Sequence, residues 1–333
     1  MRSFQHYNAR SIREAAALLA KHNGKAKVIA GGTDLIGSLK NHSIPNYPET
    51  LINIKGIRGL DSIKAGSRGI KIGALTKLAD IVQSPDVRRD YPLLEQAARS
   101  VAAPNIRNMA TVGGNLAQDV RCWYYRYPKQ IGGPIVCLRK GGKTCNALAG
   151  DNRYHSIFGA APAAGHRSFG CFAVAPSDLA VALVALGASI VTTKRVLDAQ
   201  YFFSASVAST TVLEPDELIK EIRIPKPSRK ARQRYLKFTL RKPVDFAIVS
   251  VASVVEEKGG VCGNARIVLG AVAPSPVRAT QAEEFLKGKA INELNAEEAA
   301  KLAFADARPL SMNAYKVEIG RTLVKRSILA APE

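Results

Sequence analysis

The stretch that decides the fold is KVIAGGTDLIGSLKN, residues 27–41. It begins with β-branched apolar residues, passes through two consecutive glycines and continues with apolar residues at helical spacing. We therefore predict a strand, a glycine turn and a helix. Glycines let a ligand approach the backbone, and several N–H groups that point into one space suit a pyrophosphate. A tight turn without any ligand is the alternative that this motif alone leaves open.

Two common nucleotide-binding patterns are missing from this turn. It has neither the Gly-x-Gly-x-x-Gly spacing of a Rossmann turn nor the Gly-Lys-Ser/Thr of a triphosphate-binding loop. NAD binding by the Rossmann route is therefore disfavoured.

Two further motifs complete a candidate ligand site. TVGGNL (111–116) is a second double-glycine turn, flanked by a hydroxyl and an amide. Two such turns can hold one diphosphate from two sides. PSDLA (176–180) places an acid before a helix, where Asp178 either contacts a ligand or caps the helix.

The elements around these motifs predict an α+β protein. A helix begins after Ser11, LAVALVALGASIVTT (179–193) is typical of a core helix followed by a strand, and we find no internal repeat. The further predicted strands lie at 50–54, in a hairpin over 60–75 and within 235–272. The further predicted helices lie at 76–84, 91–102, 279–288, 296–306 and 313–328. Residues 103–178 show little periodicity, and so long a loop needs a function or a staple.

Composition indicates a soluble globular chain of two or three domains. It has 333 residues, of which 47% are hydrophobic and 6% aromatic. No apolar run reaches the roughly 18 residues of a membrane span. The N-terminus lacks the apolar stretch of a secretory signal. These features favour the cytoplasm, although export as a folded complex through a partner's signal stays open.

The chain is strongly basic, with a net charge of +21. Its densest basic run is KPSRKARQRYLKFTLRK (226–242), which contains no acidic residue. Such a run binds nucleic acid, meets an acidic protein, or is simply solvated. Because no nucleic-acid motif surrounds it, we expect faces that meet protein partners or cofactor, and no nucleic-acid partner.

Four of the five cysteines fall within one 50-residue window. They are Cys122, Cys137, Cys145 and Cys171, whereas Cys262 stands apart in a predicted strand as a buried residue. Thiols grouped in this way indicate one tetrahedral metal site. Structural zinc, thiols without a ligand, and replacement of a cysteine ligand by His155 or His166 remain alternatives. Disulfides are disfavoured in a cytosolic setting.

Taken together, the motifs resemble one family. FQHYNARSIREAAALL, KVIAGGTDLI, GIKIGALT, RNMATVGGNL and PSDLAVAL occur in the order and at the intervals of the flavin subunit of molybdenum hydroxylases. That family includes xanthine dehydrogenase and carbon monoxide dehydrogenase. The resemblance covers essentially the whole chain, including a C-terminal domain of the carbon monoxide dehydrogenase flavoprotein type.

The resemblance implies FAD in a two-part domain of the vanillyl-alcohol-oxidase (PCMH) type. The residues that match its pyrophosphate loop are Val28, Ile29, Ala30, Gly31, Gly32, Thr33, Asp34 and Leu35. Those that match the opposite side of the diphosphate and ribityl chain are Thr111, Gly113, Gly114 and Asn115. The resemblance also implies that Val101 lies near the flavin, that Leu218 lies near the adenine, and that Asp178 and Lys237 contact FAD. No histidine stands in a flavinylation motif, so we expect non-covalent FAD.

An insertion distinguishes this chain from most of the family. It resembles the flavin subunits of 4-hydroxybenzoyl-CoA reductase and bacterial aldehyde oxidoreductases, which carry an extra 4Fe-4S cluster. Cys122, Cys137, Cys145 and Cys171 would be its ligands. We expect an FAD-binding domain at 1–225, with subdomains 1–55 and 56–225 and the insertion at about 118–172. The expected C-terminal α+β domain is 226–333.

This resemblance implies an electron-transfer subunit. A molybdenum-cofactor large subunit and a 2Fe-2S small subunit would be its partners, and no acid–base catalytic residue is expected. Electrons would pass from the 2Fe-2S partner through FAD to an external acceptor, for which an acidic protein such as a ferredoxin is suited. The rival functions are a stand-alone FAD-dependent oxidase or dehydrogenase and a zinc-stapled basic protein that binds nucleic acid.

Overall fold

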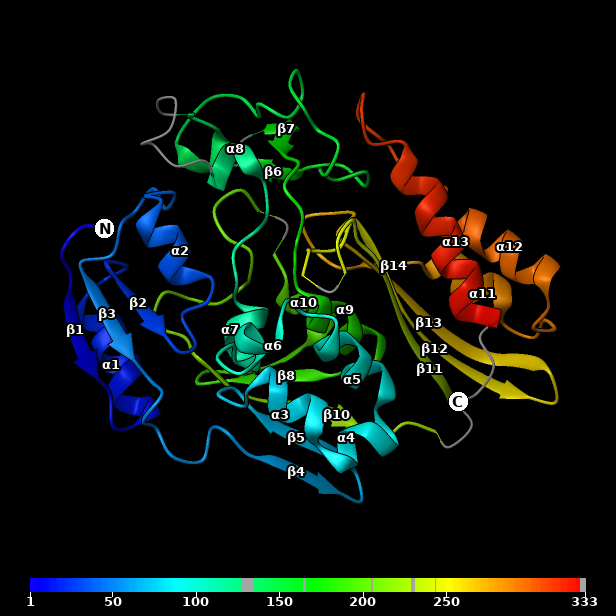
Figure 1. The fold of residues 1–333 in the computed structure, drawn as a ribbon, viewed down its shortest axis with the longest axis horizontal. Coiled ribbons are helices and arrows are strands. Elements are labelled where there is room, and N and C mark those ends of the chain that lie inside the picture. Colours follow the sequence, from blue (N-terminus) through cyan, green and yellow to red (C-terminus); the bar gives the residue numbers. More distant parts are fainter. Residues whose placement is uncertain (127–134, 164–165, 205, 229–230, 243, 330–333) are drawn as a thin grey trace.

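In the part of the chain that the structure describes, the three larger sheets lie side by side, and a fourth sheet has only two strands (Figure 1). The computed structural model describes residues 1–126, 135–163, 166–204, 206–228, 231–242 and 244–329. Helices and strands alternate through the sheets as predicted for an α+β protein. None of the helices in these ranges is long and apolar enough to cross a membrane.

The first sheet is small and parallel, in the order β1-β3-β2. Its elements are β1 (Gln5–Asn8), α1 (Ile12–Lys21), β2 (Ala26–Ile29), α2 (Leu35–Lys40) and β3 (Thr50–Asn53). Ser11 caps α1 by accepting the N–H of Glu14, as its position predicts. The helix buries Ala15 and Leu19 in the same core as Ile52. The predicted strand, glycine turn and helix of residues 27–41 are therefore confirmed.

The second sheet is antiparallel, in the order β4-β5-β10-β8-β9. Its strands are β4 (Ile63–Gly66), β5 (Gly69–Gly73), β8 (Ser189–Thr192), β9 (Val196–Asp198) and β10 (Ile219–Pro225). Ile70 and Ile72 of β5 are buried while Lys71 between them is exposed, so one face of the sheet packs and the other meets solvent. The hairpin predicted over 60–75 is confirmed.

Helices cover the inner face of this second sheet. They are α3 (Leu78–Gln83), α4 (Pro85–Asp90), α5 (Pro92–Arg99), α9 (Asp178–Ala185) and α10 (Ala199–Phe202). Every residue of α9 is buried, because this helix also packs against β12 and β13 of the C-terminal sheet. The sequence analysis missed α4, although Ser84 and Pro85 supply the usual N-cap and first helical residue.

The irregular middle of the chain contains only short elements. They are α6 (Pro104–Arg107), α7 (Val112–Leu116), α8 (Trp123–Arg126), a 3₁₀ turn (Leu138–Lys140), β6 (Ala161–Ala163) and β7 (His166–Cys171). A small core holds Val120, Tyr125, Cys137 and Cys171 together. The part of the insertion with α8, β6 and β7 lies above the first two sheets in Figure 1.

The C-terminal sheet is antiparallel and is sandwiched between two layers of helices. Its elements are β11 (Ala231–Phe238), β12 (Val249–Lys258), β13 (Val261–Gly270), β14 (Val277–Arg278), α11 (Thr280–Leu286), α12 (Glu293–Leu302) and α13 (Tyr315–Leu329). One face packs on α11 and α13, the other on α5 and α9. Cys262 is fully buried in β13, as predicted.

The basic run at 226–242, a candidate surface for a protein partner, is partly built into the C-terminal sheet. Much of its described part is β11, which pairs with β12 along its whole length. The side chain of Arg232 is only 13% exposed and forms a 3.2 Å ion pair with Glu257. Arg229 and Lys230 lie outside the described residues.

Gly320 provides a test of the helix packing in the C-terminal unit. A Cβ atom there would lie 2.0 Å from the ring of Phe304. We predict that Gly320→Ala lowers the free energy of unfolding by about 1–3 kcal/mol, because a packed ring must move. Phe304→Leu should recover part of this loss in the double variant, as measured by urea denaturation.

Gly37 in α2 is the matched control, since a Cβ atom there meets nothing within 4 Å. Gly37→Ala should be neutral or stabilising, because alanine favours helix over glycine by about 1 kcal/mol. Equal effects of the two substitutions would show that the contact with Phe304 does not limit the packing.

Candidate functional site

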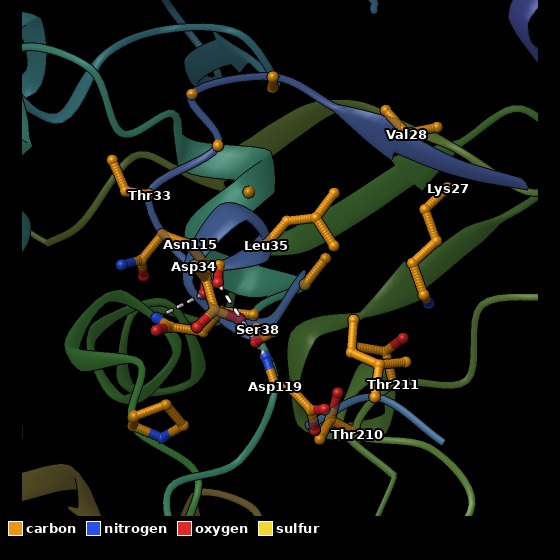
Figure 2. A pocket seen from close by; sticks show the side chains of 18 of the residues that line it. Lys27, Val28, Thr33, Asp34, Leu35, Ser38, Asn115, Asp119, Thr210 and Thr211 are labelled. Atoms are coloured by element: carbon orange, nitrogen blue, oxygen red, sulfur yellow. Dashed lines mark hydrogen bonds between the residues drawn. The ribbon is translucent and has the colours of Figure 1, made fainter. Parts of the chain in front are cut away.

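A cavity of about 680 Å³ lies where the first sheet, α7, the insertion and the C-terminal sheet meet. Figure 2 shows the turn after β2 on one side of this cavity, with Thr210 and Thr211 on the other. Its volume is within the usual range of cofactor and ligand sites.

Most of the residues predicted to bind a ligand line this cavity. They are Val28, Ile29, Ala30, Gly31, Gly32, Thr33, Asp34, Leu35, Val101, Thr111, Gly114, Asn115, Asp178 and Lys237. Two predicted residues do not line it. Gly113 packs against Ala74, and Leu218 lies in the core of the first sheet.

The two double-glycine motifs lie against each other. A Cβ atom on Gly31 would lie 2.1 Å from the carbonyl oxygen of Met109, two residues before the second motif. Gly32 adopts φ +72°, a conformation that L side chains rarely adopt. Both glycines are therefore required by the backbone itself, and the turn they form opens onto the cavity.

The second motif is helical rather than a turn, which corrects the prediction. Thr111 is the N-cap of α7, and its hydroxyl accepts the N–H of Gly114 at 3.2 Å. The glycines therefore occupy the first turn of a short helix. This helix approaches β5 closely, because the N–H of Gly113 donates to the carbonyl of Ala74 at 2.8 Å.

Asp178, the first residue of α9, joins that helix to β11 of the C-terminal sheet. Its carboxylate accepts from the Tyr235 hydroxyl at 2.5 Å and from Nζ of Lys237 at 2.7 Å, and both charged side chains are buried. The alternative that Asp178 caps α9 is wrong, because Ser177 is the N-cap. Ser177 also donates to the side chain of Asn115 at 2.6 Å, which fixes that amide at the cavity wall. Sequence reasoning missed Tyr235 and Ser177.

Charged residues of the insertion reach the GGTD turn, a second feature that the sequence analysis missed. Asp34 forms ion pairs with Arg121 at 2.8 Å and Arg126 at 3.0 Å, and it accepts the backbone N–H of Asp119 at 3.0 Å. Burial opposes ionisation of Asp34, but the two arginines outweigh it and hold its pKa below the usual value. Burial and the charge of Arg126 lower the pKa of Arg121 to about 10.

The four clustered cysteines converge on one part of the insertion as free thiols. Cys137, Cys145 and Cys171 are buried and Cys122 is partly buried. Cys122, Cys137 and Cys145 each interact electrostatically with Cys171. Burial raises the pKa of Cys122 to about 12 and also raises the pKa values of Cys137 and Cys145.

Polar groups surround these thiols. Nε2 of His155 lies 3.2 Å from Sγ of Cys122, and Nε of Arg139 lies 3.3 Å from Sγ of Cys171. Nδ1 of His155 is buried without a hydrogen-bond partner, and burial followed by the charge of Lys316 lowers the pKa of His155 to about 4. The described residues contain no group of three metal-ligating side chains that stands ready to hold an ion. The predicted metal site therefore stays a prediction.

The C-terminal unit clamps this insertion. Asn313 donates to the carbonyls of Asn152, His155 and Ser156. Lys316 is fully buried. Its Nζ donates to the carbonyl oxygen of His155 at 3.0 Å and to the carbonyl oxygen of Ala271 at 2.6 Å. Burial lowers the pKa of Lys316 to about 7.

Two known families match the chain in succession. The family described as "FAD binding domain in molybdopterin dehydrogenase" matches residues 2–227, and the "CO dehydrogenase flavoprotein C-terminal domain" matches residues 234–331. The chain belongs to this FAD-binding family. The predicted fold class and the predicted assignment to FAD-dependent oxidoreductases are thereby confirmed, and the cavity is the candidate FAD site.

Individual relatives match over nearly their whole length. The aldehyde oxidoreductase FAD-binding subunit PaoB of Escherichia coli is 33% identical, covering 99% of this chain and 98% of that protein. The carbon monoxide dehydrogenase medium chain of Hydrogenophaga pseudoflava is 29% identical, covering 98% and 96%. A solved structure of carbon monoxide dehydrogenase from the latter organism superposes with a TM-score of 0.77 at 28% identity, covering 99% and 97%.

The glycines at the cavity wall should be required for flavin binding. We predict that Gly32→Val or Gly114→Val leaves less than about a tenth of the wild-type FAD after gel filtration, because a branched side chain would intrude on the cavity. Gly56→Val is the control, since a Cβ atom on Gly56 meets nothing within 4 Å. Stoichiometric FAD in both cavity variants would mean that these glycines serve only the backbone.

Proposed function

We propose that this chain binds FAD non-covalently in the cavity between its two double-glycine motifs. The observation that carries the proposal is the contact of Gly31 with Met109, which brings both motifs to one cavity in a chain of an FAD-binding family. Crowding at Gly31 and the positive φ of Gly32 leave backbone, not side chains, at the turn that would face the diphosphate.

The chain's charged residues would orient the cofactor. The two arginines on Asp34 offset its carboxylate, so that the turn can accept an anionic pyrophosphate. Asp178 and Lys237 form a rigid, mutually neutralising pair on the cavity wall. Bound FAD accepts two electrons and releases them singly or as a pair.

We further propose that the chain is the electron-transfer subunit of a three-part molybdenum hydroxylase. Its relatives carry names such as medium chain and FAD-binding subunit, which support a place beside a molybdenum-cofactor large subunit and a 2Fe-2S small subunit. The organic substrate would then react on the large subunit. The two family matches, which end at 227 and begin at 234, support the proposed domain division near 225.

We propose that Cys122, Cys137, Cys145 and Cys171 bind a 4Fe-4S cluster. The donor set fits, because four free thiols converge and thiolates are the preferred ligands of iron–sulfur clusters. Burial raises the pKa values of Cys122, Cys137 and Cys145 above the usual thiol value, so bound iron would be needed to stabilise their thiolate forms. Arg139 is buried beside Cys171 and would offset part of the negative charge of such a cluster.

An acidic protein is the partner that the charge of the chain favours. On the exposed face of the second sheet, Lys64 and Lys71 are direct cross-strand neighbours, and Arg223 opposite Lys71 pairs with Glu221 at 2.6 Å. Like charges in such positions repel one another, and an acidic surface would relieve this repulsion. We propose this face, rather than the run at 226–242, for an acidic electron acceptor or subunit.

The function is tested by assembling this chain with a molybdenum-cofactor large subunit and a 2Fe-2S small subunit. We predict that the isolated chain binds FAD but turns over no aldehyde, and that the three-chain complex reduces an external acceptor. The Gly114→Val complex should assemble yet lose at least about 90% of acceptor reduction, because it would lack flavin. An isolated monomer with full turnover would show a stand-alone oxidase instead.

Iron content tests the cysteine proposal separately. We predict roughly four irons per chain after anaerobic purification, as the ligand set of one cluster requires. Serine at Cys122, Cys137, Cys145 or Cys171 should lower the iron content, while Cys262→Ser changes neither iron nor FAD. Zinc in place of iron, or wild-type iron in all four variants, would contradict the proposal.

A further inference from the structure

Arg139 is a buried cation whose side chain lies between two sites. Its side chain is only 4% exposed, and Nε lies 3.3 Å from Sγ of Cys171. Nη2 donates to the carbonyl of Ser206 at 2.9 Å. The same residue lines the candidate flavin cavity. It therefore contacts a proposed cluster ligand from the side that faces the flavin.

The carboxylate nearest to Arg139 is already engaged by other groups. Asp119 lies 3.7 Å from Nη1 of Arg139, beyond a good hydrogen bond. Its two oxygens accept from the Tyr125 hydroxyl at 2.6 Å and from the backbone N–H of Val120 at 2.8 Å. Asp119 therefore offsets part of the charge of Arg139, while Nε of the guanidinium still donates to the sulfur of Cys171.

A fixed positive charge beside a cysteine ligand changes the energy of adding an electron. Hydrogen bonds to the sulfurs and nearby charges are among the main determinants of iron–sulfur reduction potentials. In a buried site, charge interactions are strengthened by the low dielectric. A cation at this position favours the form with one more electron, and so raises the potential.

We infer that Arg139 is a positioning residue that raises the reduction potential of the centre bound at Cys171. This inference rests on the proposed iron–sulfur cluster. The guanidinium donates to the Cys171 sulfur and lies between that centre and the flavin cavity. Its hydrogen bond to Ser206 and the cation–π contact with Tyr125 hold it in this place. Its role toward FAD is limited to forming part of the cavity wall.

The test uses the full chain, purified anaerobically, with three variants at one position. Arg139→Met removes the charge and the donor, Arg139→Gln keeps a donor without charge, and Arg139→Lys keeps the charge. The control is Arg153→Met in the same insertion, since Arg153 is half-exposed and pairs with Asp151. Iron and FAD are counted per chain. The cluster is titrated by electron paramagnetic resonance and the flavin by its visible spectrum.

We expect Arg139→Met and Arg139→Gln to keep iron and FAD while the cluster potential becomes more negative. Arg139→Lys should lie between these variants and wild type, and Arg153→Met should match wild type. The flavin potential should move less than the cluster potential in every variant.

The outcomes separate this inference from the proposal beneath it. A wild-type chain without iron would overturn both. Four irons with an unchanged potential in Arg139→Met would overturn the role of Arg139 alone. If the uncharged variants lose iron, the Arg139→Lys variant distinguishes a charge role of Arg139 from a structural role. Retained iron at a potential near that of wild type supports the charge role, and lost iron shows a structural one.

Discussion

The whole site depends on one close approach of two backbone segments. Gly31 lies so near the carbonyl of Met109 that any side chain larger than hydrogen would collide with it. This contact joins the first sheet to the segment that leads into α7, and residues of both segments line the cavity. A larger residue would separate the two segments, and with them both halves of the proposed diphosphate site. Packing, more than any ligating side chain, therefore creates the candidate flavin site.

The sequence predicts the local elements and the residues at the cavity because the informative signals are local. Glycine pairs, the N-cap at Ser11 and the apolar run of α9 each depend on neighbours in the chain. The sequence does not predict the side-chain contacts between residues that are far apart in the chain. The buried pair of Asp178 and Lys237 joins residues 59 positions apart, and Arg126 reaches Asp34 over 92 positions. Nothing in the periodicity of either segment indicates its partner.

Tertiary contacts change the local structure that two sequence patterns suggest. TVGGNL was predicted as a turn because glycine disfavours helix, yet tertiary contacts with Ala74 hold its glycines in α7. The charge of the basic run at 226–242 made it a candidate surface for a protein partner. Pairing with β12 buries part of this run, and Arg232 forms an ion pair with Glu257 of the neighbouring strand. In both cases tertiary structure overrides the local preference.

The insertion is an integral part of the site rather than an appendage. At the N-terminal end of the insertion, Arg121 and Arg126 neutralise Asp34 in the turn of the first sheet. In the later part of the insertion, Asn313 and Lys316 of the C-terminal unit donate hydrogen bonds to the carbonyl of His155. Asp119 contributes its backbone N–H to Asp34 and its carboxylate to Tyr125, so the flavin cavity and the cysteine region share one hydrogen-bonded network. A displacement of the cysteine segment would therefore be transmitted to the turn that faces the proposed pyrophosphate.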